Sequence, residues 1–147
     1  MIPVETREVN AVLLVRVFLG VLFFLQGYDK VFRIGVKQVI ETIHTPLADK
    51  GVPNTFSIIG AYFTSYVELI CGALLIVGFL KYYCLYLLGI DLLFAAFAFG
   101  MVEAMWDMKH IFPRVVLLVF LLMVPSQWDI VSIDRFWSFI KFFKSTF

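Results

Sequence analysis

The stretch IIGAYFTSYVELICGALLIVGFL, residues 58–80, decides the fold. It carries a single charged side chain, Glu68, and is long enough to cross the ~30 Å hydrocarbon core of a bilayer, which takes ~20 apolar residues. Gly60, Thr64, Glu68 and Gly72 recur at every fourth position, so small and polar side chains share one helix face. Such a face suits close contact between helices inside a membrane. We therefore predict a transmembrane helix with an inward polar stripe.

Three further segments have the same apolar character: residues 11–32, 82–102 and 112–128. Residues 58–80 and 82–102 are separated by little more than Lys81, which requires a tight antiparallel hairpin. The prediction is an all-α protein, an integral membrane antiparallel bundle of four transmembrane helices. Residues 1–147 are expected to form a single membrane domain.

The composition of the whole chain supports this assignment. Of its 147 residues, 62% are apolar and 16% charged, with 18% aromatic, whereas soluble domains are roughly half apolar and a quarter charged. The mean hydropathy is +0.95. These values exclude a soluble protein, and a net charge of +1 with scattered basic residues excludes nucleic acid as a partner.

Two segments have helical amphipathic patterns without the length to span a bilayer. In residues 36–50 the apolar side chains recur at helical spacing opposite polar ones, and Gly51 and Pro53 end the pattern. Residues 131–145 repeat this design with basic residues on the polar side. We expect both to be interfacial helices, the first lying on the membrane surface or capping the bundle.

Three ionisable residues fall inside the predicted spans: Arg16, Glu68 and Asp91. Such groups are costly in a bilayer and normally face the bundle interior with a partner. We expect Arg16 to pair with Glu68, Asp91 or both. The favoured interpretation is a salt bridge that fixes helix register, and the alternatives are a proton-active or ligand site and a surface for a partner subunit's charge.

A second group is predicted where the first and third spans leave the membrane: Tyr28, Glu103, Asp107, His110 and Arg114. Their spacing could place metal ligands on one helix face, but charged residues commonly collect at a membrane exit. A hydrated salt-bridge cluster is therefore favoured and no metal is predicted. The third alternative is a pocket for a proton, a quinone or another head group, with quinone as the one cofactor considered.

Other motifs narrow the functional classes. Cys71 and Cys84 lie in apolar segments without metal-ligand spacing and are interpreted as packing residues. The predicted spans hold no histidine pair for haem, and the chain has no P-loop, nucleophile elbow or dinucleotide fingerprint. We do not expect the chain to be an enzyme on its own.

The motifs, in their order along the chain, resemble those of the DoxX family over nearly the whole sequence. The stretch LVRVFLGVLFFLQGYDKVF, residues 14–32, is similar to the family's first helix, and YVELICGALLIVGF, residues 66–79, to its segment with a glutamate followed by glycines. The closing SIDRF, residues 132–136, resembles the family's S-L-D-R end. Family members often carry histidine where this chain has Gln26, and Cys71 replaces one of the paired glycines.

The resemblance implies a four-helix membrane protein, with some relatives linked to quinone-coupled redox complexes and distant ones to protein trafficking or assembly. We therefore expect an accessory subunit of a larger membrane complex, with the lipid bilayer and other membrane subunits as partners. The alternatives are an assembly subunit of a secretion or insertion machine and a small-molecule or proton-binding membrane protein. The expected location is a bacterial inner membrane with cytoplasmic termini, as the family suggests. The Lys and Arg counts on the two sides are nearly equal and do not decide the orientation.

Overall fold

The computed structural model describes residues 6–102 and 111–146, and every regular element in these ranges is helical. The predictions at Glu103, Asp107 and His110 lie outside the described residues. The elements are α1 (Thr6–Tyr28), the π-helix η1 (Asp29–Ile34), α2 (Val36–Ala48), α3 (Asn54–Val77), α4 (Lys81–Gly100), α6 (Phe112–Met123), the 3-10 turn η2 (Ser126–Trp128) and α7 (Ile133–Thr146).

Within residues 6–102 and 111–146, three helical segments are long and apolar enough to cross a membrane. They are α1 continued by η1, with 29 residues, α3 with 24 and α4 with 20. In contrast, α6 has 12 residues and is about 18 Å long, short of a bilayer core. It ends before Pro125 because the preceding residue, Val124, takes the extended backbone that proline favours. The helical prediction is confirmed, and the fourth predicted span is shorter than expected.

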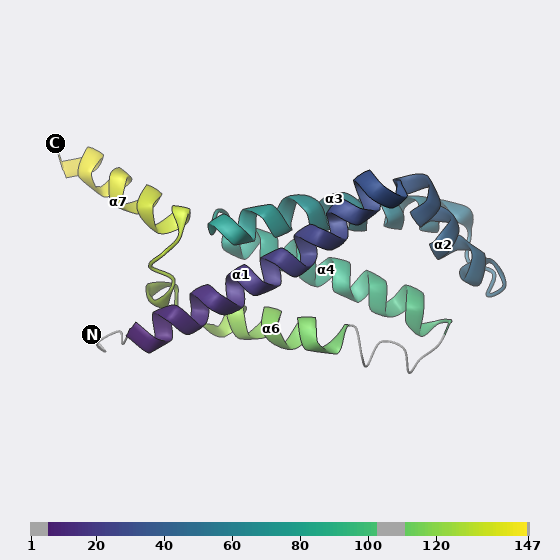
Figure 1. Cartoon of the computed structure of the whole chain (residues 1–147), viewed down its shortest axis with the longest axis horizontal. Helices are drawn as coiled ribbons and strands as arrows, with labels where there is room; N and C mark the ends of the chain where they lie inside the picture. Colours follow the sequence, from purple (N-terminus) through teal and green to yellow (C-terminus); the bar gives the residue numbers. More distant parts are fainter. Residues whose placement is uncertain (1–5, 103–110, 147) are drawn as a thin grey trace.

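Close backbone contact joins α1 to α3, which cross in Figure 1. A Cβ on Gly27 would lie 2.2 Å from the backbone nitrogen of Leu69, and a Cβ on Gly72 would lie 2.4 Å from that of Phe24. Only glycine permits this approach, which brings Glu68 to the α1 interface. At the other end of the same stripe, Gly60 faces the Phe94 ring of α4 instead.

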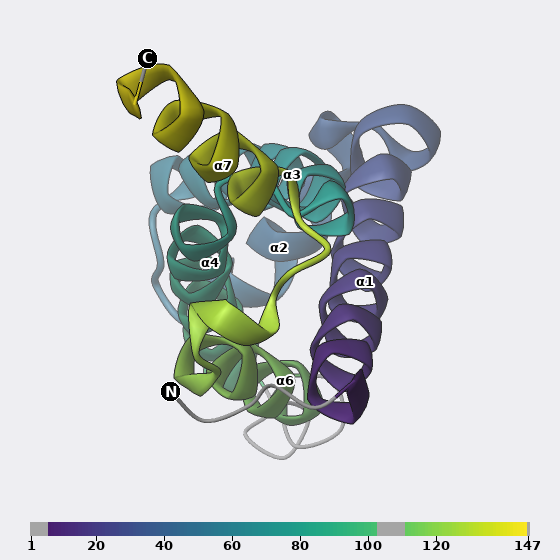
Figure 2. The ribbon, with the colours of Figure 1, turned by 90° about the vertical axis from the view of Figure 1, so that its left-hand side faces the viewer.

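A second packing layer places α4 between α3 and α6 (Figure 2). Its inward leucines, Leu85, Leu88 and Leu92, belong to one buried cluster with Leu118 and Leu121 of α6. The outward apolar side chains remain exposed, as expected where lipid replaces water. The most exposed of these are Leu93 (72%), Tyr83 (71%) and Met123 (79%).

The two amphipathic segments differ in their packing. Val39, Ile43 and Leu47 of α2 are buried in a cluster with Ala61 of α3 and Ala98 of α4. This packing makes α2 a cap over the bundle end where α3 begins. Helix α7 projects away from the bundle at the opposite end, the end at which α1 begins (Figure 1). Its described apolar side chains, which include Phe136 and Trp137, are exposed.

Candidate functional sites at the two ends of the bundle

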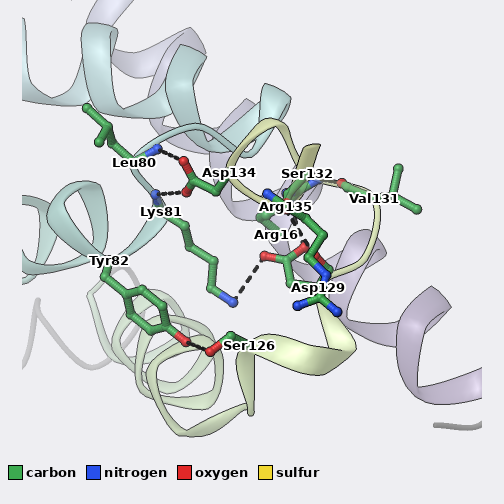
Figure 3. A network of polar contacts seen from close by, with 10 residues as sticks. All are labelled: Arg16, Leu80, Lys81, Tyr82, Ser126, Asp129, Val131, Ser132, Asp134 and Arg135. Atoms are coloured by element: carbon green, nitrogen blue, oxygen red, sulfur yellow. Dashed lines mark hydrogen bonds and ion pairs between the residues drawn. The ribbon is translucent and has the colours of Figure 1, made fainter. Parts of the chain in front are cut away.

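Arg16 of α1 is the largest fully buried side chain among the described residues, with 1% of its surface exposed. Its guanidinium lies 3.1 Å from Oδ1 of Asp129 and donates a hydrogen bond of 2.6 Å to the carbonyl of Val131 (Figure 3). The ammonium of Lys81 lies 3.1 Å from Oδ2 of the same carboxylate. We call Arg16, Lys81 and Asp129 the Arg16 cluster, in which one carboxylate holds two buried cations.

The predicted pairing of Arg16 with Glu68 or Asp91 is therefore wrong. Arg16 lies level with Gly78, where an added Cβ would contact its guanidinium, whereas Glu68 packs beside Gly27. Ten residues of chain separate Glu68 from Gly78, or about 15 Å along the helix axis. An arginine side chain does not bridge that distance when its charge is already bound at the other end.

Asp134 connects the Arg16 cluster to the turn between α3 and α4. Its carboxylate accepts hydrogen bonds from the backbone N–H groups of Leu80 (2.9 Å) and Lys81 (3.0 Å), which begin α4 (Figure 3). Its own N–H donates to the carbonyl of Gly78 at 3.1 Å. The segment after η2 is thus fixed to the helix start, a position where carboxylates satisfy free N–H groups.

Glu68 has a different partner at the other end of the bundle. Its Oε2 lies 2.6 Å from the ammonium of Lys30, which also donates to the hydroxyl of Thr64 at 3.0 Å. Glu68 is 4% exposed, whereas the Lys30 side chain is 26% exposed. Lys30 lies in η1, and the sequence analysis did not predict it as the partner of Glu68.

Asp91 of α4 adds a second carboxyl group beside this pair. It is 1% exposed, and its neighbours include the side chains of Thr64 and Glu68. Its Oδ1 has no hydrogen-bond partner in the described part of the chain. Two carboxyl groups and one ammonium therefore share this interior, so Glu68 and Asp91 do meet as parts of one polar group.

A cavity of about 280 Å³ opens beside this polar group. We call it the Lys30 cavity. Its polar lining consists of Gln26, Lys30, Thr42, Thr64, Glu68 and Arg114. Its apolar lining consists of Ile34, Val39, Ile43, Phe94, Ala95, Ala98, Phe99 and Ile111. With the Gln26 amide oxygen turned toward Arg114, the guanidinium donates to it at 2.6 and 3.2 Å.

The predicted head-group cluster is thus divided. Arg114 lines the Lys30 cavity, whereas Tyr28 is 43% exposed and its ring packs against Phe24 and Phe32 outside it. In the described part of the chain, no group of three or more His, Cys, Asp or Glu side chains is placed to hold a metal ion. The cavity could instead hold a molecule with an apolar body and hydrogen-bond acceptors.

These features define a helical membrane protein with a separate buried charge group at each end and an amphipathic cavity at one of them. The DoxX family model matches residues 11–101, and the chain belongs to the DoxX family. The matched region holds Arg16, Lys30, Glu68 and Asp91 but not Asp129. No curated protein and no solved structure matches the chain significantly.

Proposed function

We propose that this protein is an accessory subunit of a quinone-linked membrane redox complex, and that the Lys30 cavity holds a quinone head group. The observation that supports this is the combination of a half-buried ammonium and a guanidinium with apolar walls in one cavity. Ligand sites in proteins are typically concave and apolar with a few placed polar groups. The proposed site has this composition and lies in a membrane protein, where lipid-soluble ligands are found.

The polar groups of the cavity suit the two carbonyl oxygens of a quinone ring. Lys30 and Arg114 carry N–H donors and are held by Glu68 and Gln26, so both cations have fixed positions before a ligand arrives. Charged donors make stronger hydrogen bonds than neutral ones. Phe94 and Phe99 provide aromatic surface for the ring. Glu68 and Asp91 are the groups that would exchange protons with a bound head group.

The assignment as a subunit rests on the electron carrier that a bound quinone would require from another protein. A quinone passes electrons to a redox partner, and the sequence carries no dinucleotide fingerprint or haem-ligand pair within its spans. The electron carrier would therefore belong to another subunit. The exposed apolar surface of the helices is available to lipid or to such a subunit.

We propose that α6 and η2 together make the fourth crossing, in a bacterial inner membrane with cytoplasmic termini. The start of α1 and the whole of α7 lie at the same end of the molecule (Figure 1), as an even number of crossings requires. Cysteine labelling in intact cells at Arg7 and Ser138 tests this topology. Labelling of both positions from the periplasm would contradict it.

The site is tested by Lys30→Gln, which removes the charged donor and keeps an amide that can still bond to Glu68. We expect the affinity for a short-tailed ubiquinone in detergent to fall about tenfold or more, because a hydrogen bond from a charged group contributes about 1.5–3 kcal/mol. Equilibrium dialysis measures this binding. Lys37→Gln on the exposed side of α2 is the matched control and should bind like the parent.

A second function is favoured by the Arg16 cluster, whose contacts join α1, the start of α4 and the segment after η2. This arrangement fits a purely structural or assembly subunit of a secretion or insertion machine. The parent chain would then bind no quinone, and Lys30→Gln would change only the yield of the complex. Equal quinone binding by Lys30→Gln and its parent would also show that the Lys30 cavity is not the quinone site.

A further inference from the structure

A second pocket lies at the other end of the molecule, between the start of α4 and the first turns of α7. Its volume is about 180 Å³. We call it the Lys81 pocket. It is lined by Lys81, Tyr82, Ser126, Asp129, Ser132, Asp134, Arg135 and Ser138. The lining is rich in hydroxyl groups and includes two cations, Lys81 of α4 and Arg135 of α7.

The charge around this pocket is unbalanced among the described residues. Arg16, Lys81 and Arg135 are cationic, and Asp129 and Asp134 are anionic. The carboxylate of Asp134 is engaged by the backbone N–H groups of the α4 start. Asp129 is therefore the one carboxylate placed to neutralise two buried cations, and a net positive charge remains.

The buried donors are also incompletely used. Lys81 is 3% exposed, and apart from its ion pair with Asp129 its ammonium has no hydrogen-bond partner in the described part of the chain. An ammonium has three N–H donors, and leaving buried donors unpaired is costly. Arg135 is exposed and forms no ion pair with another described residue. Both cations could therefore accept a further anionic partner.

An apolar groove begins one helical turn further along α4. It has a volume of about 350 Å³ and is lined by side chains of α4 and α6, among them Leu85, Tyr86, Leu118 and Leu122. Tyr82 of the Lys81 pocket precedes Tyr86 by one turn on α4. A polar pocket at the bundle end followed by an apolar groove along the span matches the form of a lipid, with a head group above an acyl chain.

We propose that the Lys81 pocket binds the phosphate group of an anionic phospholipid, whose acyl chain lies in the groove between α4 and α6. Phosphate oxygens accept hydrogen bonds from hydroxyl groups, ammonium and guanidinium alike, and the surplus positive charge favours an anion. Trp128 and Trp137 directly precede the pocket residues Asp129 and Ser138 in the sequence, and tryptophan is enriched at the level of the lipid head groups. The site is independent of the Lys30 cavity and does not require the proposed quinone function.

The test is native mass spectrometry of the purified full chain in detergent, with phosphatidylglycerol or diacylglycerol of the same acyl length added. We expect one phosphatidylglycerol to be retained and diacylglycerol to be lost. Arg135→Gln should weaken the retained binding about fivefold, because an exposed cation contributes modestly. Arg33→Gln, which removes another exposed cation at the other end, is the control and should bind like the parent.

Inorganic phosphate added to the protein with its bound phosphatidylglycerol distinguishes a lipid head group from free phosphate as the ligand. Displacement of phosphatidylglycerol by millimolar phosphate would overturn the proposal that the bound phosphate belongs to a lipid. Equal retention of diacylglycerol, or equal weakening by Arg33→Gln and Arg135→Gln, would overturn the phosphate site itself. Ser138→Ala gives a second variant that removes only a hydroxyl group from the pocket and leaves the Arg16 cluster intact.

Discussion

Replacement of Asp129 by asparagine is expected to lower the free energy of unfolding by about 3–5 kcal/mol. The change preserves the shape of the side chain but removes the one carboxylate that lies 3.1 Å from both Arg16 and Lys81. Both cations are nearly fully buried, so each would lose its counter-charge without gaining access to water. Removing one partner of a buried ion pair is strongly destabilising because the remaining charge stays buried without a counter-charge.

Unfolding of the purified protein by heat or by SDS in mixed micelles measures this loss. Asp29→Asn is the matched control, because it is the same substitution in a pair with Arg33 whose side chains are 45% and 72% exposed. Exposed pairs contribute about 0–1 kcal/mol, so this variant should unfold like the parent. If Asp129→Asn were as stable as Asp29→Asn, the structural role of the Arg16 cluster would be refuted.

Gly72→Ala is expected to destabilise the protein by about 3 kcal/mol, at the upper end of the range for overpacking. The added methyl group would lie 2.4 Å from the backbone nitrogen of Phe24 and 2.7 Å from its Cα. Backbone atoms do not rotate away as the end of a long side chain does, so α1 and α3 would have to separate. The separation would also move Lys30 away from Glu68.

The same unfolding measurement applies, with Gly89→Ala as the control. A Cβ on Gly89 would find only the Leu118 side chain at 3.9 Å, an ordinary contact. Alanine favours a helix over glycine by about 1 kcal/mol, so Gly89→Ala should be neutral or slightly stabilising. Equal effects of the two substitutions would mean that α1 and α3 do not meet at Gly72.

The helices could be predicted because each depends on a local property of the chain. The length of the apolar run in residues 58–80 and its four-residue repeat of small side chains are enough to indicate a span and its inward face. The end of α6 was less evident, since residues 112–128 are mostly apolar but Pro125 interrupts the helix inside them. A count of apolar residues does not register that break.

The ion pairs could not be predicted, because they depend on which helix ends meet. Arg16 and Asp129 are 113 residues apart, and in the sequence Asp129 is simply the polar residue that follows the predicted span 112–128. From the sequence, Lys81 is expected to be a turn residue. It is only 3% exposed because its contacts with Asp134 and Asp129 hold the segment after η2 over it. Arg16 has a nearer carboxylate in Asp129 and therefore does not reach Glu68.

Paired substitutions test the central claim most directly, which is that Glu68 belongs to Lys30 and not to Arg16. Unfolding free energies are measured for Lys30→Gln, Arg16→Gln and Glu68→Gln and for each cation variant combined with Glu68→Gln. Contacting residues couple by about 0.5–3 kcal/mol, whereas residues further apart than about 10 Å are additive within about 0.5 kcal/mol. We predict coupling of at least about 1 kcal/mol between Lys30 and Glu68 and additivity between Arg16 and Glu68. Strong coupling of Arg16 with Glu68, alongside additivity for Lys30, would contradict the structure described for both ends of the bundle.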